Sequence, residues 1–285
     1  MAADAGVYSF SLKNIIGTYY LIGSNGSDLL IGNASVLALS GGEGDDTITS
    51  DRASTQTLNG GAGNDTLAGN AELQTMNGDD GNDVLISGFG VDKIFGGDGD
   101  DSFIIRGGSN TPVLGEFLDG GSGLNTLTAG GNIASAEIRN IQSLVIDGGY
   151  IALTAEQFNG FSNVSTINGF PTGAGTTYTN IEVIGTGVVD LRGKIANDLI
   201  GLYASASGNT LIGNDLVQSL YGGAGDDILY GYGGDDGLEG RDGNNTIYGG
   251  DGNDTFNQTG AAGINKFYGE GGDDRFDFVY GGLLP

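Results

Sequence analysis

Aspartate residues recur at a fixed place in a glycine-rich pattern, and their oxygen atoms are the clearest chemistry in this sequence. Five segments read Gly-Gly-x-Gly-x-Asp, and they begin at positions 41, 60, 96, 222 and 249. Near matches begin at positions 23, 78, 120, 231, 240 and 269. Ca²⁺ prefers six to eight hard oxygen ligands at about 2.3–2.6 Å. One acid per segment is too few, but two neighbouring segments with glycine-exposed carbonyl groups would supply enough oxygen atoms.

The charge balance and the missing residue types narrow the class of partner. The 285 residues include 36 acidic and 10 basic side chains, a net charge of −26, and no cysteine or histidine. Those two residue types are the usual ligands of zinc and transition metals, so the composition favours a cation that binds oxygen. The acidic balance argues against nucleic acid and against direct contact with anionic membranes. We expect no Sec signal peptide and no membrane span, because the sequence has no basic-then-apolar leader and no eighteen successive apolar residues.

The elements that position these aspartates follow a nine-residue period. A single large apolar residue stands two positions after each sixth-position residue, and it keeps its spacing even where the glycines are lost. These residues are Leu21, Leu30, Leu39, Ile48, Leu58, Leu67, Met76, Leu85, Ile94 and Phe103, then Leu202, Leu211, Leu220, Leu229, Leu238, Ile247, Phe256, Phe267 and Phe276. We interpret each nonapeptide as a six-residue turn followed by a short strand whose middle side chain points inward. Two stacked columns of such residues predict a parallel β-solenoid, with two turns and two strands in each 18-residue rung.

The repeat divides the chain into four predicted parts. They are an N-terminal lead-in at 1–13, a first β-roll at 14–128, a bridge without the motif at 129–194 and a second β-roll at 195–285. In the first roll the strong loops lie about one rung apart, so we expect one acidic edge and one largely plain edge. In the second roll strong loops follow at nine-residue steps, so we expect acids on both edges. Aliphatic clusters in the bridge predict longer, wider β-rungs, with a small separate β domain as the alternative.

The nonapeptide Gly-Gly-x-Gly-x-Asp-x-apolar-x resembles the repeat of the RTX (repeat-in-toxin) family of secreted bacterial proteins. The resemblance spans roughly 14–128 and 195–277. It implies an all-β fold, a right-handed parallel β-roll or β-solenoid in which irregular β-helical rungs join two RTX blocks. It also implies that Ca²⁺ lies between two loops on the same edge, one rung apart, and that the protein leaves the cell through a type I secretion system.

The resemblance implies two kinds of calcium ligand. The sixth-position side chains are those of Asp28, Asp46, Asp65, Asp83, Asp101, Asp227, Asp236, Asn245, Asp254 and Asp274. The residues at loop positions one to four, whose backbone carbonyl groups complete each shell, are Gly41, Gly42, Glu43, Gly44, Gly60, Gly61, Ala62, Gly63, Gly78, Asp80, Gly81, Gly96, Gly97, Asp98, Gly99, Gly222, Gly223, Ala224, Gly225, Gly231, Gly233, Gly234, Gly240, Asp242, Gly243, Gly249, Gly250, Asp251 and Gly252. Asn125 and Asn245 remove a charge from the sixth position and weaken their sites, and Asp92 is a lone candidate on the plain edge.

Pairing loops one rung apart gives about seven Ca²⁺ ions, which would supply about +14 against the acidic excess. Without metal the sixth-position acids would stack as ladders of like charge, which is unfavourable. We therefore expect folding and metal binding to be one event. The resemblance further implies that millimolar Ca²⁺ outside the cell folds a chain that was exported unfolded.

The function that these features favour is a non-enzymatic, calcium-binding module of a secreted or cell-surface protein. The first alternative is a surface-layer protein or adhesin that self-assembles or binds a surface polysaccharide. A second is an enzyme that acts on polysaccharides, whose acids would come from Glu137, Asp147, Glu156, Glu182 and Asp190 in the bridge. A third is a secreted protein that interacts with a host.

Two smaller features stay open at this point. Tyr230, Tyr232 and Tyr248 could stack on sugars, although tyrosines of this kind more often cover the surface of a roll. Few residues follow the last repeat, whereas RTX proteins usually carry a secretion signal there. We interpret this as either an excised fragment or an unusually short signal.

Overall fold

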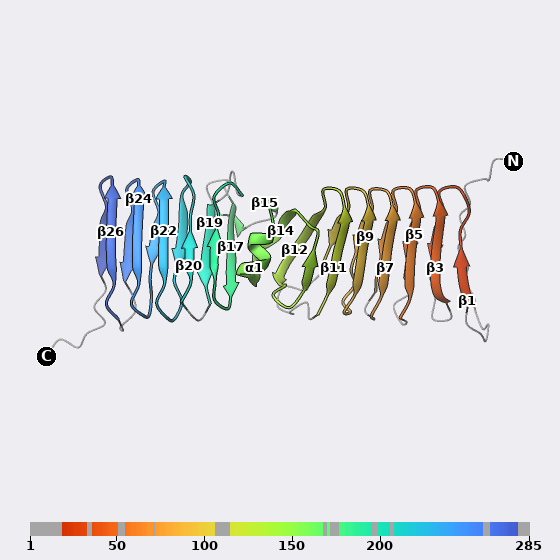
Figure 1. Cartoon of the computed structure of the whole chain (residues 1–285), viewed down its shortest axis with the longest axis horizontal. Coiled ribbons are helices and arrows are strands. Elements are labelled where there is room, and N and C mark those ends of the chain that lie inside the picture. The colour runs from red at the N-terminus through yellow and green to blue at the C-terminus, as the bar shows by residue number, and fades with distance from the viewer. Residues whose placement is uncertain are drawn as a thin grey trace. The chain divides into compact units, whose positions relative to one another are not determined.

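The computed structural model of the chain describes ten stretches, and the statements below concern these alone. They are residues 19–32, 36–50, 55–70, 72–105, 115–167, 170–171, 177–194, 199–205, 208–258 and 263–278. The chain divides into two compact units, 1–145 and 146–285 (Figure 1). The boundary falls within the predicted bridge at 129–194, and the predicted lead-in at 1–13 lies outside the described residues. No helix in the described part is long and apolar enough to span a membrane.

Unit 1 consists of two parallel β-sheets whose strands alternate along the chain. One sheet has the order β1-β3-β5-β7-β9-β11-β13, and β2-β4-β6-β8-β10-β12 are neighbours in the other. The first set is β1 (Tyr19–Ile22), β3 (Val36–Glu43), β5 (Thr57–Ala62), β7 (Thr75–Asp80), β9 (Lys93–Asp98), β11 (Phe117–Ser122) and β13 (Glu137–Arg139). The second set is β2 (Leu29–Ile31), β4 (Thr47–Thr49), β6 (Thr66–Ala68), β8 (Val84–Ile86), β10 (Ser102–Ile104) and β12 (Thr126–Asn132). Successive strands therefore belong to opposite sheets, as the solenoid prediction requires.

Unit 2 repeats this arrangement after an irregular start. Its two sheets have the orders β14-β17-β19-β21-β23-β25-β27 and β18-β20-β22-β24-β26. The first set is β14 (Ser143–Thr154, which begins before the unit boundary), β17 (Thr177–Ile184), β19 (Leu199–Ala204), β21 (Gln218–Tyr221), β23 (Gly237–Glu239), β25 (Thr255–Gln258) and β27 (Arg275–Phe278). The second set is β18 (Val188–Asp190), β20 (Thr210–Ile212), β22 (Ile228–Gly233), β24 (Thr246–Asp251) and β26 (Lys266–Gly271). β15 (Asn163–Ile167) pairs with β14, and β16 (Phe170–Pro171) pairs antiparallel with β17.

The core of each unit is a double column of the apolar residues that the period predicts. Leu39 pairs in register with Leu58, and Leu58 with Met76, so each side chain lies directly over the next. Sixteen of the nineteen predicted core residues are at most 1% exposed, from Leu30 to Phe103 and from Leu202 to Phe256. Burying one such side chain contributes about 1.5–3 kcal/mol, and stacking is the only way for one residue in nine to be buried. The all-β parallel solenoid is thus confirmed.

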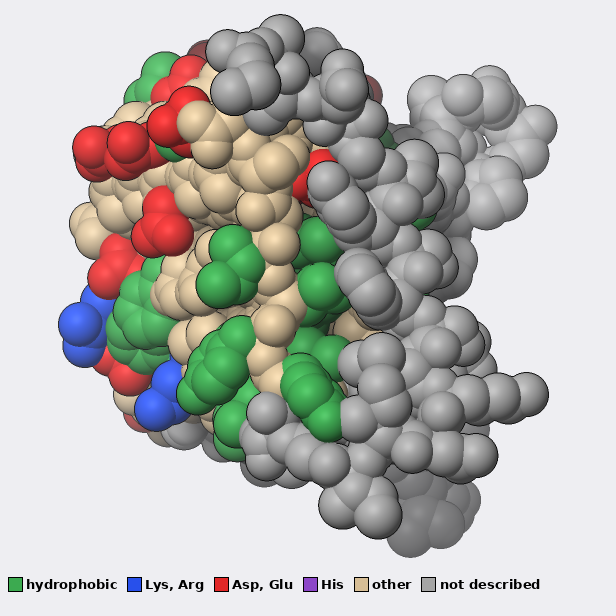
Figure 2. All heavy atoms as spheres, turned by 90° about the vertical axis from the view of Figure 1, so that its right-hand side faces the viewer, with side chains coloured by type: hydrophobic (Ala, Val, Ile, Leu, Met, Phe, Trp, Pro, Cys, Tyr) green, Lys and Arg blue, Asp and Glu red, His purple; other side chains and the backbone are tan. Residues whose placement is uncertain are grey.

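The prediction of buried side chains is wrong at the ends of the described stacks. Phe276 is 44% exposed, and Leu21 and Phe267 are only partly buried. They lie on β27, β1 and β26, each the first or last strand of its sheet, so no further described strand covers them. Figure 2 looks onto the end of unit 1 that carries β1, where hydrophobic side chains are visible on the surface and Tyr20 and Ile22 are 70% and 72% exposed.

The segment predicted as a bridge contains long strands, as expected, and one helix that was not expected. α1 (Ala155–Gly160) follows β14 directly. The Thr154 side chain accepts a hydrogen bond from the backbone of Gln157, and the Gln157 side chain accepts one from the backbone of Thr154. This is a capping box, and the sequence Thr-Ala-Glu-Gln carries its signature.

Candidate metal sites

The six-residue turns join the two sheets of each unit, and their sixth side chains turn inward beneath the turn. We call the edge of unit 1 with the loops that begin at 23, 41, 60, 78 and 96 the acidic edge. Its sixth residues are at most 4% exposed. One carboxylate oxygen of Asp46, Asp65, Asp83 and Asp101 accepts the backbone N–H of the sixth residue in the preceding loop, and the amide oxygen of Asn125 in the next loop does the same for Asp101. These bonds run from Asp28 N to Asp46 Oδ1 (2.8 Å), Asp46 N to Asp65 Oδ1 (2.7 Å), Asp65 N to Asp83 Oδ1 (2.8 Å), Asp83 N to Asp101 Oδ1 (3.0 Å) and Asp101 N to Asn125 Oδ1 (2.8 Å).

The other carboxylate oxygen on this edge has no donor. The Oδ2 atoms of Asp46, Asp65, Asp83 and Asp101 are buried and lack a hydrogen-bond partner among the described residues. A buried carboxylate oxygen without a partner is costly, because burial removes its water and nothing replaces it. Four such atoms at equivalent positions indicate that the site is completed by a positive group.

The backbone brings a second oxygen to the same place. A β-carbon built on Gly41 would collide with Asp46 Oδ2 and crowd the carbonyl oxygen of Gly60. The collision recurs one rung on, where a β-carbon on Gly60 would meet Asp65 Oδ2 and the carbonyl oxygen of Gly78. The first glycine of each loop thus leaves a hollow in which a carboxylate oxygen and a carbonyl oxygen converge. Two oxygen atoms that face one another without a hydrogen suit a hard cation.

Unit 2 has the same ladder on one edge. Its bonds run from Gln218 N to Asp236 Oδ1 (2.7 Å), Asp236 N to Asp254 Oδ1 (2.8 Å) and Asp254 N to Asp274 Oδ1 (3.0 Å). The Oδ2 atoms of Asp236 and Asp254 are again buried without a partner in the described part of the chain.

The opposite edge of unit 2 is less acidic than expected. Its sixth residues are Asn209, Asp227, Asn245 and Asn265, so Asp227 is the one sixth-position acid among its described loops. The Oδ2 atom of Asp227 accepts a hydrogen bond from Gly223 N at 2.9 Å. The expectation of acids on both edges therefore holds on this edge at Asp227 alone among the described loops, because the other three sixth residues are asparagines.

Where asparagine occupies the sixth position, its side-chain amide nitrogen lies in the hollow and donates hydrogen bonds there. The Asn125 Nδ2 atom donates to the carbonyl oxygen atoms of Ser122 (3.4 Å) and Asn140 (3.0 Å). The Asn245 Nδ2 atom donates to those of Arg241 (3.4 Å) and Asp242 (3.3 Å). The amide nitrogen thus stands where aspartate places Oδ2, and it satisfies the carbonyl groups that a cation would otherwise bind.

Comparison with known families agrees with this geometry. The profile of the RTX calcium-binding nonapeptide repeat (4 copies) matches residues 38–54, 53–72, 75–112, 203–238, 212–247, 238–257 and 259–282, together more than half of the chain. The chain belongs to the RTX calcium-binding repeat family. No curated protein matches this RTX chain.

Burial makes the RTX carboxylates resist ionisation in the metal-free chain. Burial raises the pKa of Asp65 to about 6, that of Asp83 to about 7 and that of Asp236 to about 8. An accepted backbone N–H opposes the rise in each case, and neighbouring carboxylates add to it; Asp83 faces both Asp101 and Asp65. A cation in the hollow would reverse this balance, since it favours the charged form.

The fifth position of the RTX loops carries a second, exposed ladder that sequence reasoning missed. Here the side chain accepts from the following loop, opposite to the buried ladder. The bonds run from Asn64 N to Asp45 Oδ1 (2.7 Å), Asn82 N to Asn64 Oδ1 (2.8 Å), Asp100 N to Asn82 Oδ1 (2.7 Å) and Leu124 N to Asp100 Oδ1 (2.7 Å). The signal was present, because Asp or Asn occupies the fifth position of most loops. Adjacent acids such as Asp45 and Asp46 therefore have different structural roles.

The remaining edge of unit 1, which we call the mixed edge, holds one acid beyond the predicted candidate. Asp92 Oδ1 accepts from Gln74 N at 2.8 Å, and Glu116 Oε2 accepts from Asp92 N at 2.8 Å. Asp92 and Glu116 are 0% and 2% exposed, and burial raises the pKa of Glu116 to about 7. Glu116 was missed because residues 106–114 interrupt the period, although the buried Leu118 two positions later marks it as a sixth residue.

The other candidates do not assemble into a site of their own. Among the described residues, no three acidic side chains form a cluster that could hold a metal ion. Each RTX site in the described loops would therefore combine carboxylates from two loops with backbone carbonyl groups. Of the acids considered for catalysis, Glu137 pairs with Arg139, Glu182 accepts from the Tyr150 hydroxyl (2.6 Å) and Asp190 binds Arg192 (2.7 Å).

Proposed function

We propose that this chain is a structural module that calcium folds, within a protein that works outside the bacterial cell. The observation that carries the proposal is the set of buried Oδ2 atoms without a donor on the acidic edge and at Asp236 and Asp254. RTX repeat proteins are generally secreted, and the composition suits export as an unfolded chain. With 3 prolines and no cysteine, the chain has few slow isomerisation steps and no disulfides to form.

In this proposal the chain holds each Ca²⁺ ion between two loops of one edge. The sixth-position carboxylates contribute their Oδ2 atoms, and backbone carbonyl groups, such as that of the first residue in the next loop, complete the shell. The loop pairs around a donor-free Oδ2 are 41/60, 60/78, 78/96, 96/120, 231/249 and 249/269, which gives about six ions. The pairs 23/41 and 222/240, which the repeat alone suggests, are weaker candidates because the Oδ2 atoms of Asp28 and Asp227 already accept backbone N–H groups. The metal supplies positive charge between stacked carboxylates, so each ion ties one rung to the next.

The proposal includes export through a type I secretion system, which the RTX resemblance implies and with which the calcium dependence is consistent. Low cytosolic Ca²⁺ leaves the sites empty, and repulsion among 36 acidic side chains keeps the chain expanded. Millimolar Ca²⁺ outside the cell then neutralises the ladders, and the solenoid forms there. The module serves stability and assembly rather than catalysis.

A far-UV circular dichroism titration tests the proposal, from chelator to millimolar Ca²⁺ with Mg²⁺ as the control. We expect a cooperative change from coil to β-structure with Ca²⁺ and none with Mg²⁺, because Mg²⁺ demands a tighter octahedral shell. A β-type spectrum that is the same in chelator and in Ca²⁺ would overturn calcium-coupled folding.

A second candidate function is calcium-dependent self-assembly at a cell surface, as in a surface-layer protein or adhesin. The exposed apolar side chains on the terminal described strands favour it, namely Tyr20 and Ile22 on β1 and Phe276 and Phe278 on β27. Light scattering of the folded protein tests it: mass that grows with protein concentration supports assembly, and a constant monomer mass excludes it.

A further inference from the structure

An open hollow of about 380 Å³ lies on unit 2, on the outer side of the loops at 231, 249 and 269 that carry the Asp236, Asp254 and Asp274 ladder. It is lined by Tyr230, Tyr232, Tyr248, Gly249, Gly250, Asp251 and Glu270. Three of these residues occupy the second loop position on successive strands, since Tyr232 pairs with Gly250 and Gly250 with Glu270. Gly250 has no side chain, so the hollow opens between Tyr232 on one side and Glu270 on the other.

Tyr232 and Glu270, the two walls of the hollow, have a backbone conformation that glycine adopts more easily than other residues. Tyr232 has φ 77° and Glu270 has φ 71°, in the left-handed region where the repeat places glycine at most second positions. A tyrosine and a glutamate there are strained, so they disfavour the fold relative to glycine. The repeat also tolerates Asp79 and Arg241 at this position, but Tyr232 and Glu270 are the two of these four side chains that line the hollow.

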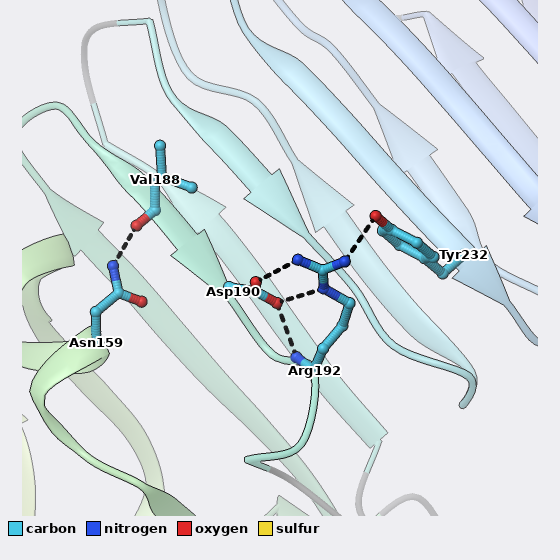
Figure 3. Close-up of polar contacts among 5 residues, drawn as sticks. All are labelled: Asn159, Val188, Asp190, Arg192 and Tyr232. Carbon is cyan, nitrogen blue, oxygen red and sulfur yellow. Dashed lines mark hydrogen bonds and ion pairs between the residues drawn. The ribbon is translucent and has the colours of Figure 1, made fainter.

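A fixed set of contacts holds Tyr232 in place (Figure 3). The Arg192 Nη1 atom donates to the Tyr232 hydroxyl at 2.9 Å, and the guanidinium carbon lies 4.9 Å from the ring centroid. Asp190 fixes Arg192 in turn, accepting from its Nε (2.9 Å) and its Nη2 (2.7 Å). The tyrosine ring is therefore oriented before any ligand arrives, which lowers the entropic cost of binding.

The neighbouring tyrosines offer edges and hydroxyl groups rather than faces. Tyr230, Tyr248 and Tyr268 stack with centroids 4.8 Å apart at interplanar angles of 6° and 11°, so they cover one another's faces. Tyr232 is tilted by 46° from Tyr230, with centroids 6.2 Å apart, and is 41% exposed. The hollow thus combines one accessible ring face with hydroxyl groups and two carboxylates.

We infer that this hollow binds a neutral hexopyranose unit of a glycan. The C–H face of the sugar packs on Tyr232, and its hydroxyl groups donate to the carboxylates of Glu270 and Asp251. Two strand spacings separate Tyr232 from Glu270, about 9.5 Å, which holds one ring at van der Waals distance from the tyrosine. This binding activity goes beyond calcium-coupled folding.

The acidic walls and the single ring face decide against other ligands. Carboxylates at Asp251 and Glu270 repel uronic acids and other anionic sugars. An aromatic cage for an organic cation needs several ring faces around one point, and here the Tyr230 and Tyr248 faces are covered by stacking.

The test uses the full chain in Ca²⁺, with saturation-transfer NMR and titration of four neutral hexasaccharides of glucose (α- and β-linked), mannose and galactose. A hexamer of galacturonate is the anionic probe. The test variants are Tyr232→Gly and Glu270→Gly, which restore the glycine of the repeat. The matched control is Arg241→Gly, because Arg241 also has a positive φ (61°) at a second loop position but does not line the hollow.

We expect at least one neutral hexasaccharide to bind and the galacturonate hexamer not to bind. Tyr232→Gly should weaken binding about tenfold or more without lowering the thermal midpoint, and Arg241→Gly should leave the affinity unchanged. The inference is overturned if none of the four neutral sugars binds at millimolar concentration, if galacturonate binds as well as they do, or if Tyr232→Gly binds like the parent chain. A circular dichroism spectrum of each variant in Ca²⁺ separates these outcomes from a failure of calcium-coupled folding.

Discussion

The acidic and mixed edges of unit 1 share a backbone course but differ in how their sixth side chains are satisfied. On both edges one side-chain oxygen accepts the backbone N–H of the preceding rung, as at Asp65 and at Asp92. The second polar atom makes the difference. Asp65 Oδ2 has no described partner, whereas the Gln74 Nε2 atom donates to Asn70 Oδ1 at 2.9 Å.

The comparison separates two tasks that one loop position performs. Joining one rung to the next needs only an acceptor oxygen, which aspartate, asparagine, glutamine or glutamate supplies. Binding a cation needs a second oxygen that nothing else satisfies, which a carboxamide does not have. The hollow of an RTX loop can therefore be filled, and the rung closed, by a metal ion or by an amide group. The residue type at the sixth position determines which of the two it is.

The largest expected effect is that low pH promotes folding of the metal-free protein, because protonation removes the charge of the buried carboxylates. The folded pKa values of about 6 to 8 at Asp65, Asp83 and Asp236 lie above the unfolded value of 3.8, so the folded chain binds more protons. Its stability therefore falls as pH rises from about 4 through these values, and the penalty is complete about one unit above the highest of them, near pH 9. In chelator, circular dichroism should show more β-structure at pH 5 than at pH 8.

Light scattering controls for precipitation at pH 5, because the sequence pI is ≈ 4.1. A β-signal that stays constant or falls between pH 8 and pH 5 would contradict the role given to buried carboxylates.

Asp83→Asn should turn a metal-closed rung into an amide-closed one. In chelator the variant should gain on the order of 2 kcal/mol of folding free energy, because a carboxylate with a pKa raised to about 7 is replaced by a neutral donor. In Ca²⁺ it should bind one or two fewer ions, since Asp83 faces loops on both sides.

Calorimetric counting of bound Ca²⁺ and urea unfolding in chelator measure both effects. Asp100→Asn is the matched control, because it removes the same charge from an exposed fifth position. Equal effects of the two substitutions would show that total charge, rather than the buried hollow, sets the calcium response.

Asn245→Asp makes the reverse exchange in unit 2. Its carboxylate would lose the donor that now binds the Arg241 and Asp242 carbonyl groups, so the variant should be less stable in chelator by about 1–3 kcal/mol. It should also bind one additional Ca²⁺ ion. Asn244→Asp, one residue earlier and exposed, should do neither, and an unchanged ion count in Asn245→Asp would refute the exchange.

The smallest expected effect is on the mixed edge and does not depend on metal. Gln74→Ala removes the amide that bonds Asn70, for a loss of about 1 kcal/mol. Urea unfolding at two saturating Ca²⁺ concentrations should give the same loss at both. A loss that shrinks as Ca²⁺ rises would place a metal ion at this edge.

The nine-residue spacing was enough to predict the fold and the inner column from Leu30 to Phe103. Even where a strand carries neighbouring apolar residues, as at Val84 and Ile86, strand alternation turns them away from the core and buries the middle residue, Leu85. Exposure at Phe276 could not be read from the repeat, because it depends on whether another strand follows β27. The helix α1 was not predicted, although the sequence at Thr154 has the capping-box pattern, because the helix lies in a segment without the nine-residue period on which the prediction rested.

The sequence predicted which side chains belong to the candidate sites, but not how each site is filled. The motif indicates which aspartates turn inward, but not that the Asn125 amide takes the place of an ion by donating to Ser122 and Asn140. That exchange depends on which carbonyl groups point into the hollow, and this is a property of the stacked backbone. The strained Tyr232 and Glu270 were likewise visible as departures from glycine, but only the stacking of their rungs brings them around one hollow.

Anomalous diffraction from crystals grown in Ca²⁺ is the most direct test of the account. We predict calcium peaks beside the Oδ2 atoms of Asp46, Asp65, Asp83, Asp101, Asp236 and Asp254, and none at the amide groups of Gln74, Asn125 or Gln218. Calcium at the amide-closed rungs, or no calcium beside the buried carboxylates, would contradict the claim that the sixth side chain decides how each rung is closed.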